Sequence, residues 1–235
     1  MTLPPGYWPA LLSDYVIAYQ QAFPTAGGSS EATPSRGALI LACSVAQHET
    51  QNGLAWPGTN NFGAVQLRGL TLQEKTAFDD GTLKSGDYTP DRTGVLHVDT
   101  HPSPSGSIPY PVWFAAFPDR ILGIAHYLKA LYRLSDSEAD RDGATCESLV
   151  LHMYEHGYFE EFDHHRGIVR PVGKRSVPLL PEEQARVDDY AGAVNACFAM
   201  ICGALTAWDY GRDINTETPD PARASTIPPP PDDVA

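Results

Sequence analysis

The chain is poor in basic side chains. Its 235 residues include 16 lysines and arginines against 29 aspartates and glutamates, which gives a net charge of −13 at pH 7. A surface of this sign repels phosphate backbones and anionic membranes, so we expect no nucleic-acid partner.

Long apolar runs are also missing. No stretch of roughly 18 consecutive apolar residues occurs, so the sequence predicts no membrane-spanning helix. The segment at residues 1–14, MTLPPGYWPALLSD, has neither a basic region nor a small-residue cleavage site. We therefore expect no signal peptide.

Cysteine is scarce. The chain has four, none of them in a CxxC pair, and three lie in apolar stretches with helical spacing. This placement favours buried free thiols over disulfides. The four are Cys43, Cys146, Cys197 and Cys202.

The composition is that of an ordinary globular domain, with 42% hydrophobic and 19% charged residues. The helix expected at 36–50 is apolar on nearly all sides, so we expect it to be central and buried. Apolar residues at helical spacing predict helices at 8–23, 36–50, 71–78, 119–134, 145–158 and 181–208.

Residues 80–116 have a different pattern. Glycine and proline interrupt them, and two β-type runs at 94–100 and 107–117 predict a hairpin with a loop at 101–107. The preceding residues, 53–69, are dense in glycine and asparagine and predict tight turns. The predicted fold class is therefore mainly α (α+β), a helical body with a small β-hairpin lobe at about 80–116.

The C-terminal part has two irregular segments. Residues 160–181 are charged and rich in histidine, which predicts an extra loop. Residues 211–235 are rich in proline and have almost nothing to bury, so we expect a disordered tail. We therefore predict one domain at 1–210.

One carboxylate is distinguished by its position. The apolar helix ends in AQHETQNG, residues 46–53, which places Glu49 at the end of an apolar run. A lone Glu at a helix end is usually a solvated surface residue. The sequence NNFGAVQ at 60–66 follows closely and predicts a turn with Gly63 at positive φ and asparagine side chains bracing the backbone.

These segments resemble the glucosaminidase-type peptidoglycan hydrolases of bacteria and their phages, which share a core with lysozymes and lytic transglycosylases. ALILACSVAQHETQNG at 38–53 is similar to that family's buried helix, which ends in a catalytic Glu, and NNFGAVQ is similar to its Asn-Asn-Phe-Gly turn. FAAFPDRILGIAHYLKAL at 114–131 resembles a strand end with its following helix. LVLHMYEHGY at 149–158 resembles a helix ending in Gly-Tyr, and DDYAGAVNACFAMI at 188–201 resembles a closing helix that bears a tyrosine.

The resemblance covers residues 8–204, with three departures. Residues 160–181 are longer than the family needs, Val65-Gln66 replaces Ile-Lys, and the hairpin contains no Glu. A second catalytic carboxylate in the hairpin would therefore have to be an aspartate.

The resemblance implies a lysozyme-like fold and an endo-N-acetylglucosaminidase that cleaves the β-1,4 bonds of peptidoglycan glycan strands without a cofactor. Glycosidic bonds break through an oxocarbenium-like transition state, and one carboxyl group must stay protonated to give the leaving oxygen its proton. Apolar surroundings raise the pKa of a Glu toward about 6. Glu49, at the end of an apolar helix and beside Trp56 and Phe62, is therefore the predicted general acid.

A glycosidase of this kind uses a second carboxylate on the opposite face of the sugar. The resemblance places it in the hairpin, where Asp99 is the best-placed acid. If no carboxylate reaches the site, the N-acetyl group of the sugar acts as the nucleophile. That route also permits the product of a lytic transglycosylase.

Further residues are candidate substrate contacts. Tyr158 resembles the family's cleft tyrosine, whose hydroxyl would bind the substrate or stabilise developing charge, and Tyr190 is a weaker candidate. Asn61 and Gln66 would offer exposed amides to N-acetyl groups.

Aromatic side chains complete the predicted site. Phe62 and Trp56 are also candidate substrate contacts beside the general acid, and Trp56 or Trp113 would stack on a sugar face. A buried tryptophan, however, needs no ligand.

Two other functions stay open. HMYEH at 152–156 matches H-x-x-E-H, an inverted zinc-peptidase motif that would take a further ligand from residues 163–165. Alternatively, the chain is a non-catalytic structural or wall-binding module of a phage tail or injection machine. Without a signal peptide, an enzyme would reach the bacterial wall through a virion, a holin or a secretion apparatus, with the tail as a docking element for the larger assembly.

Overall fold

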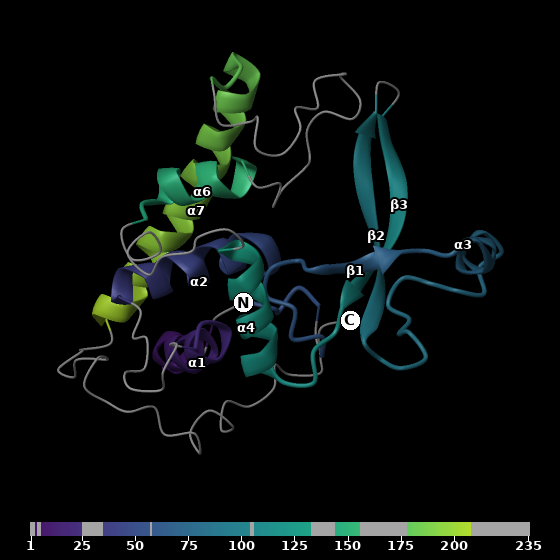
Figure 1. Ribbon diagram of the computed structural model, residues 1–235, viewed down its shortest axis with the longest axis horizontal. Coiled ribbons are helices and arrows are strands. Elements are labelled where there is room, and N and C mark those ends of the chain that lie inside the picture. The colour runs from purple at the N-terminus through teal and green to yellow at the C-terminus, as the bar shows by residue number, and fades with distance from the viewer. Residues whose placement is uncertain are drawn as a thin grey trace.

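The computed structural model describes residue 3 and residues 6–24, 35–56, 58–103, 106–132, 144–155 and 178–207. The helices other than α3 form one body, and the strands form a lobe beside it with α3 at its far side (Figure 1). The predicted α+β architecture is confirmed. The elements are α1 (Tyr7–Ala22), α2 (Arg36–Thr50), β1 (Gln66–Gly69), α3 (Leu72–Asp79), β2 (Gly94–Ser103), β3 (Gly106–Ala115), α4 (Arg120–Leu131), α6 (Cys146–Glu155) and α7 (Pro181–Ala207).

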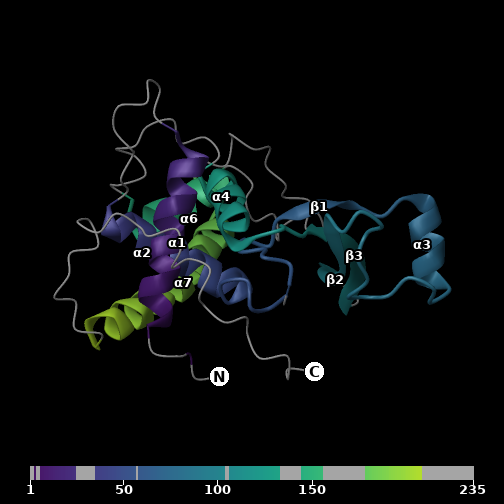
Figure 2. The same cartoon turned by 90° about the horizontal axis from the view of Figure 1, so that it is seen from below.

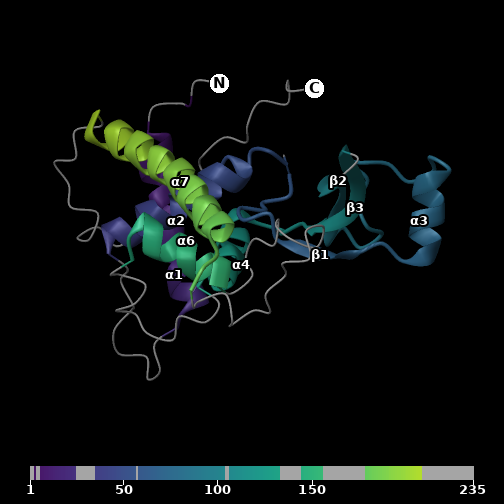
Figure 3. The same ribbon diagram turned by 90° about the horizontal axis from the view of Figure 1, so that it is seen from above.

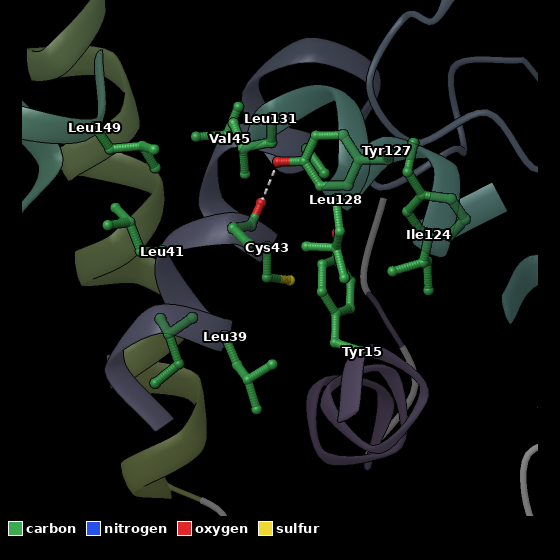
Figure 4. Packing of buried hydrophobic residues seen from close by; sticks show 14 of the residues in the cluster. Tyr15, Leu39, Leu41, Cys43, Val45, Ile124, Tyr127, Leu128, Leu131 and Leu149 are labelled. Atoms are coloured by element: carbon green, nitrogen blue, oxygen red, sulfur yellow. Dashed lines mark hydrogen bonds between the residues drawn. The ribbon is translucent and has the colours of Figure 1, made fainter. Parts of the chain in front are cut away.

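Helix α2 is the centre of the helical body, as its all-round apolar sequence predicts. Every residue from Ala38 to Ala46 is buried, because the helix packs against neighbours on several sides. Figure 4 shows Leu39, Leu41, Cys43 and Val45 among side chains of α1, α4 and α6. The hydroxyl of Tyr127 in α4 donates to the carbonyl of Ala42 at 2.6 Å, which ties the two helices together.

The last helix, α7, lies across α2 and α6 (Figure 3). Among the residues whose burial is described, it buries one stripe of side chains and leaves the others half-buried or exposed, as an amphipathic helix does. In the part of the chain that the structure describes, no helix has both the length and the apolar character needed to cross a bilayer.

The lobe is a three-stranded antiparallel sheet in the order β1-β3-β2. Pairing of β2 with β3 continues to Ser103 opposite Gly106, so the loop predicted at 101–107 was too long. The prediction assigned Pro102 to the loop, whereas in the structure it belongs to β2. Proline is tolerated in a strand where its nitrogen faces away from the partner strand. Strand β1 was also missed, since it lies within residues 53–69, which were predicted to be turns.

Helix α3 projects from the lobe and buries none of its side chains (Figure 2). Leu72 is 84% exposed. The helix is held by local contacts: Thr71 and Glu74 form a capping box, and Glu74 also pairs with Arg68 through two contacts of 2.7 Å. Hydrogen bonds from Arg68 lower the pKa of Glu74 to about 2.

The lobe joins the helical body through the segment after α2 and the segment before α4. Where the two segments meet, the N–H of Phe117 donates to the Thr59 carbonyl at 2.7 Å, and Nδ2 of Asn60 donates to the Phe117 carbonyl at 2.9 Å. Helix α4 approaches this junction closely, because a Cβ atom on Gly123 would lie 1.9 Å from the carbonyl oxygen of Asn60. Only glycine permits this approach without a backbone shift.

An ion pair fastens the start of α4 to α1. Asp14 is fully buried, and its carboxylate contacts the guanidinium of Arg120. Burial raises the pKa of Asp14 to about 6, and the charge of Arg120 limits the rise. The carboxylate is therefore less stable in the folded chain than in water, so the pair fixes the geometry at a cost in stability.

Gly123→Ala is expected to lower the free energy of unfolding by at least about 1–3 kcal/mol, because the new methyl group collides with backbone. Gly192→Ala in α7 is the matched control. A Cβ there meets nothing within 4 Å, so alanine should stabilise the helix by up to about 1 kcal/mol. Urea unfolding followed by circular dichroism measures both changes, and equal midpoints for the two variants would contradict the close approach.

Asp14→Asn is expected to change the pH dependence of stability. Because the folded-state pKa is raised, wild type loses stability as pH rises from about 4 through about 6. The asparagine variant lacks this loss, so its relative stability should increase by about 2–3 kcal/mol between pH 4 and pH 7 and stay constant above. Unfolding free energies at several pH values measure the difference. A difference independent of pH would show that Asp14 titrates normally.

Candidate functional site

The end of α2 is a turn of three consecutive left-handed residues. Gln51, Asn52 and Gly53 have φ of 51°, 56° and 80°, and the N–H groups of the first two donate to the carbonyls of Gln47 and Ala46. Asparagine and glycine adopt this conformation at low cost. The turn ends the helix directly after the last turn that carries Glu49.

A buried asparagine holds this turn against α1. The Asn52 side chain is 3% exposed. Its Oδ1 accepts from the Tyr15 hydroxyl at 3.3 Å, and its Nδ2 donates to Gln47 at 2.7 Å. A buried amide with its hydrogen bonds satisfied adds rigidity, because any movement leaves a polar atom without a partner.

Thr50 connects the same helix end to the NNFGAVQ segment. Its buried hydroxyl donates to the Phe62 carbonyl at 2.8 Å and accepts from the N–H of Gly53 at 2.9 Å. The Phe62 ring is 2% exposed and packs edge-on against Tyr15. Phe62 therefore belongs to the hydrophobic core, and the substrate contact predicted for it has no exposed surface to act through.

Glu49 is half-buried at the end of α2. The hydroxyl of Tyr190, from the middle of α7, donates a hydrogen bond to its Oε1. His48 is exposed, and its ring packs edge-on against Tyr190 with the centroids 4.7 Å apart. The predicted acid thus has a polar contact from another helix in addition to the apolar helix that carries it.

This pairing was not predicted, since Tyr190 was considered only as a substrate contact. The two residues are 141 positions apart, and no local pattern links them. A phenol that donates to a carboxylate stabilises its charged form. The hydrogen bond therefore acts against the effect of the apolar surroundings on Glu49 and also fixes the orientation of the carboxyl group.

The exposed amide expected at Asn61 is absent. Asn61 is 0% exposed. Its Nδ2 donates to the carbonyls of Val65 and Ala115, both at 3.0 Å, and its Oδ1 accepts from the N–H of Val65 at 2.9 Å. Asn61 therefore joins its own turn to the end of β3 and has no N–H left for a substrate.

The predicted positive φ at Gly63 is also wrong. The left-handed residues of this turn are Asn60 and Ala64, with φ of 51° and 50°. The turn itself exists, and its asparagines brace the backbone as expected.

Trp56 lies at the edge of the lobe. It is half-buried, and its ring is 4.7 Å from that of Phe114 and 5.4 Å from that of His97. Asp99 is half-buried on β2 opposite Tyr110. Trp56 thus packs on one residue from each strand of the hairpin.

The other candidates fall in different environments. Gln66 is exposed on β1. Trp113 is 2% exposed, with the guanidinium of Arg68 5.9 Å from its ring centroid. It is therefore a core residue of the lobe and cannot stack on a sugar.

Several predicted features lie outside the described residues. They include Tyr158, His156 of the HMYEH motif, most of the loop at 160–181, and the tail. His152 lies half-buried on α6. Among the residues that are described, no group of three or more His, Cys, Asp and Glu side chains could hold a metal ion.

The cysteines agree with the sequence prediction. All four are free; Cys43 and Cys146 are buried, and the other two are half-buried. Burial raises the pKa of the Cys43 thiol. This thiol is therefore an inert part of the core.

Comparison with known proteins finds no matching family model, no matching curated protein and no matching solved structure.

Proposed function

We propose that the chain is a glycoside hydrolase that cleaves the β-1,4 bonds of the peptidoglycan glycan strand, with Glu49 as the general acid. The observation that carries this proposal is the position of Glu49. It is a half-buried carboxyl group at the end of a buried helix, held by a tyrosine from another helix. Such a group is rigid, and a rigid acid can meet a glycosidic oxygen in a fixed geometry.

The arrangement of helices and strands is in accord with this reaction. A lysozyme-like enzyme places its acid at the end of a core helix beside a small sheet lobe, and here the loop after α2 leads directly into the lobe. The buried contacts of Asn52 and Thr50 hold that loop on the helix end. The substrate would lie between helix end and lobe.

The second catalytic group decides the product. Asp99 is the proposed base or stabilising carboxylate, because it is the half-buried acid on β2. If Asp99 does not reach the sugar, the substrate's own N-acetyl group would attack the anomeric carbon. A lytic transglycosylase on the same substrate is therefore the second candidate, and Tyr158 and Gln66 remain proposed substrate contacts in both.

Glu49→Gln is expected to lower glycan cleavage at least about 100-fold, because the amide cannot donate the proton that the leaving oxygen needs. Thermal unfolding should change little. The assay is mass spectrometry of fragments released from purified sacculi, where reducing N-acetylglucosamine, reducing N-acetylmuramic acid and anhydro ends differ in mass. Glu147→Gln, an exposed Glu of α6, is the matched control.

Three outcomes would overturn the proposal. Wild type could release no glycan fragments, the Glu49 variant could retain full activity, or the released fragments could be peptides alone. The last outcome would favour the peptidase hypothesis, and the first would favour a non-catalytic module.

Tyr190→Phe is expected to lower kcat about tenfold and to move the alkaline limb of the pH–rate profile to higher pH. The reason is the loss of one hydrogen bond to a charged group, worth about 1.5 kcal/mol, which both orients the carboxyl group and stabilises its ionised form. The acid is active when protonated, so less stabilisation of the anion extends activity toward alkaline pH.

Tyr154→Phe is the control for this change. The Tyr154 hydroxyl donates to the buried Glu183 at 2.7 Å, a similar pair away from Glu49. Its loss should reduce stability and leave the pH profile unchanged. If both variants keep the wild-type profile, Tyr190 does not act on Glu49.

A further inference from the structure

One face of the sheet carries exposed aromatic rings. Residues that are directly opposite in antiparallel strands share a face, so Asp99 and Tyr110 lie on the same face as the pair His97 and Val112. The next pair on this face includes Phe114, whose ring centroid is 5.5 Å from that of His97. Trp113 lies on the other face, beneath Arg68.

Trp56 lies over this face. Its ring packs on both Phe114 and His97 and remains partly exposed. The residue before it, Ala55, donates its N–H to the Thr50 carbonyl at 3.0 Å. The tryptophan therefore follows directly on the turn that ends α2, next to the helix end that carries Glu49.

Two tyrosines extend the face on either side of Trp56. Tyr88 pairs with Val95 in an antiparallel bridge and is 43% exposed. Its hydroxyl lies 3.4 Å from the position of a Cβ on Gly58, in the same loop as the tryptophan. Tyr110 is 37% exposed and lies farther along β3.

The spacing of these rings suits an elongated ligand. Tyr88 and Tyr110 are separated by two strand spacings across the sheet and four residues along it. With about 4.8 Å between strands and about 3.3 Å per residue, the separation is about 16 Å. This length accommodates several pyranose rings.

The side chains of this face favour a carbohydrate as the ligand. Tyr88 and Tyr110 lie apart on this face, and β2 between them carries the polar side chains of His97 and Asp99. Rings that alternate with polar groups differ from the continuous apolar patch that a protein partner would cover. Sugars offer apolar C–H faces for stacking and hydroxyl groups for hydrogen bonds.

We propose that Tyr88, Trp56 and Tyr110 form a platform that binds several consecutive sugars of the glycan strand and leads it to the end of α2. The proposal deepens the function proposed above, because it takes the same substrate, but binding can be measured without turnover. The platform gives the site a preference for long strands over short ones.

The test uses the full chain with Glu49→Gln, which prevents cleavage, and β-1,4-linked N-acetylglucosamine oligomers of three and six units as probes. Calorimetric titration should show tighter binding of the hexamer. Tyr110→Ala or Tyr88→Ala should each weaken hexamer binding about tenfold, the loss expected from one stacking contact, and should affect the trimer less. Tyr110→Phe keeps the ring and should bind almost as well as its parent.

Leu72→Ala is the control, since Leu72 is 84% exposed on α3 and lies away from the platform. A second measurement does not depend on truncating a tyrosine: hexamer binding should change the tryptophan fluorescence of the parent and not that of its Trp56→Phe variant. Equal hexamer affinity in the parent and both tyrosine-to-alanine variants would overturn the platform, as would failure of the parent to bind the hexamer.

These outcomes are separate from those of the proposed function. If the parent binds the hexamer through the tyrosines and wild type cleaves nothing, the platform stands and the hydrolase proposal fails. If wild type cleaves sacculi and the tyrosine variants bind as the parent does, the platform alone fails.

Discussion

The arrangement of the candidate site depends on the hydrogen bonds of buried amide and hydroxyl groups. Asn52 fixes the end of α2 to α1, Thr50 fixes the following loop to α2, and Asn61 fixes that loop to the end of β3. Each is almost fully buried, so breaking one of its hydrogen bonds leaves a desolvated polar atom at a cost of about 1–3 kcal/mol. The helix end, the loop and the sheet therefore behave as one rigid unit around Glu49.

The environment of Glu49 includes two influences that oppose each other. The apolar helix favours a neutral carboxyl group, whereas the Tyr190 hydroxyl favours the anion. The hydrogen bond from Tyr190 also couples the position of α7 to the orientation of the carboxyl group at the end of α2. The ring of His48 packs edge-on against the same tyrosine. A movement of α7 would therefore disturb the side chains of His48, Glu49 and Tyr190.

The helices could be predicted because their apolar spacing is strong and their caps are local. The features that could not be predicted depend on contacts between residues that are distant in sequence. β1 has four exposed residues and no periodicity, and it exists because it pairs with β3, more than forty positions later. Asn61 could be assigned to a turn, but its partner at Ala115 could not be read from the turn. The resemblance directed attention to Glu49, whereas the Tyr190 contact required the packing of α7 on α2.

The lack of buried side chains in α3 affects which part of the lobe can be changed in sequence. Its contacts are a capping box and the Arg68–Glu74 pair, and it gives no side chain to either core. Segments of this kind tolerate insertion and replacement, because nothing in the interior has to be rebuilt. The stretch between β1 and β2 is therefore where this architecture can acquire a new appendage, such as a foreign recognition element, while the end of α2 and its carboxylate keep their geometry.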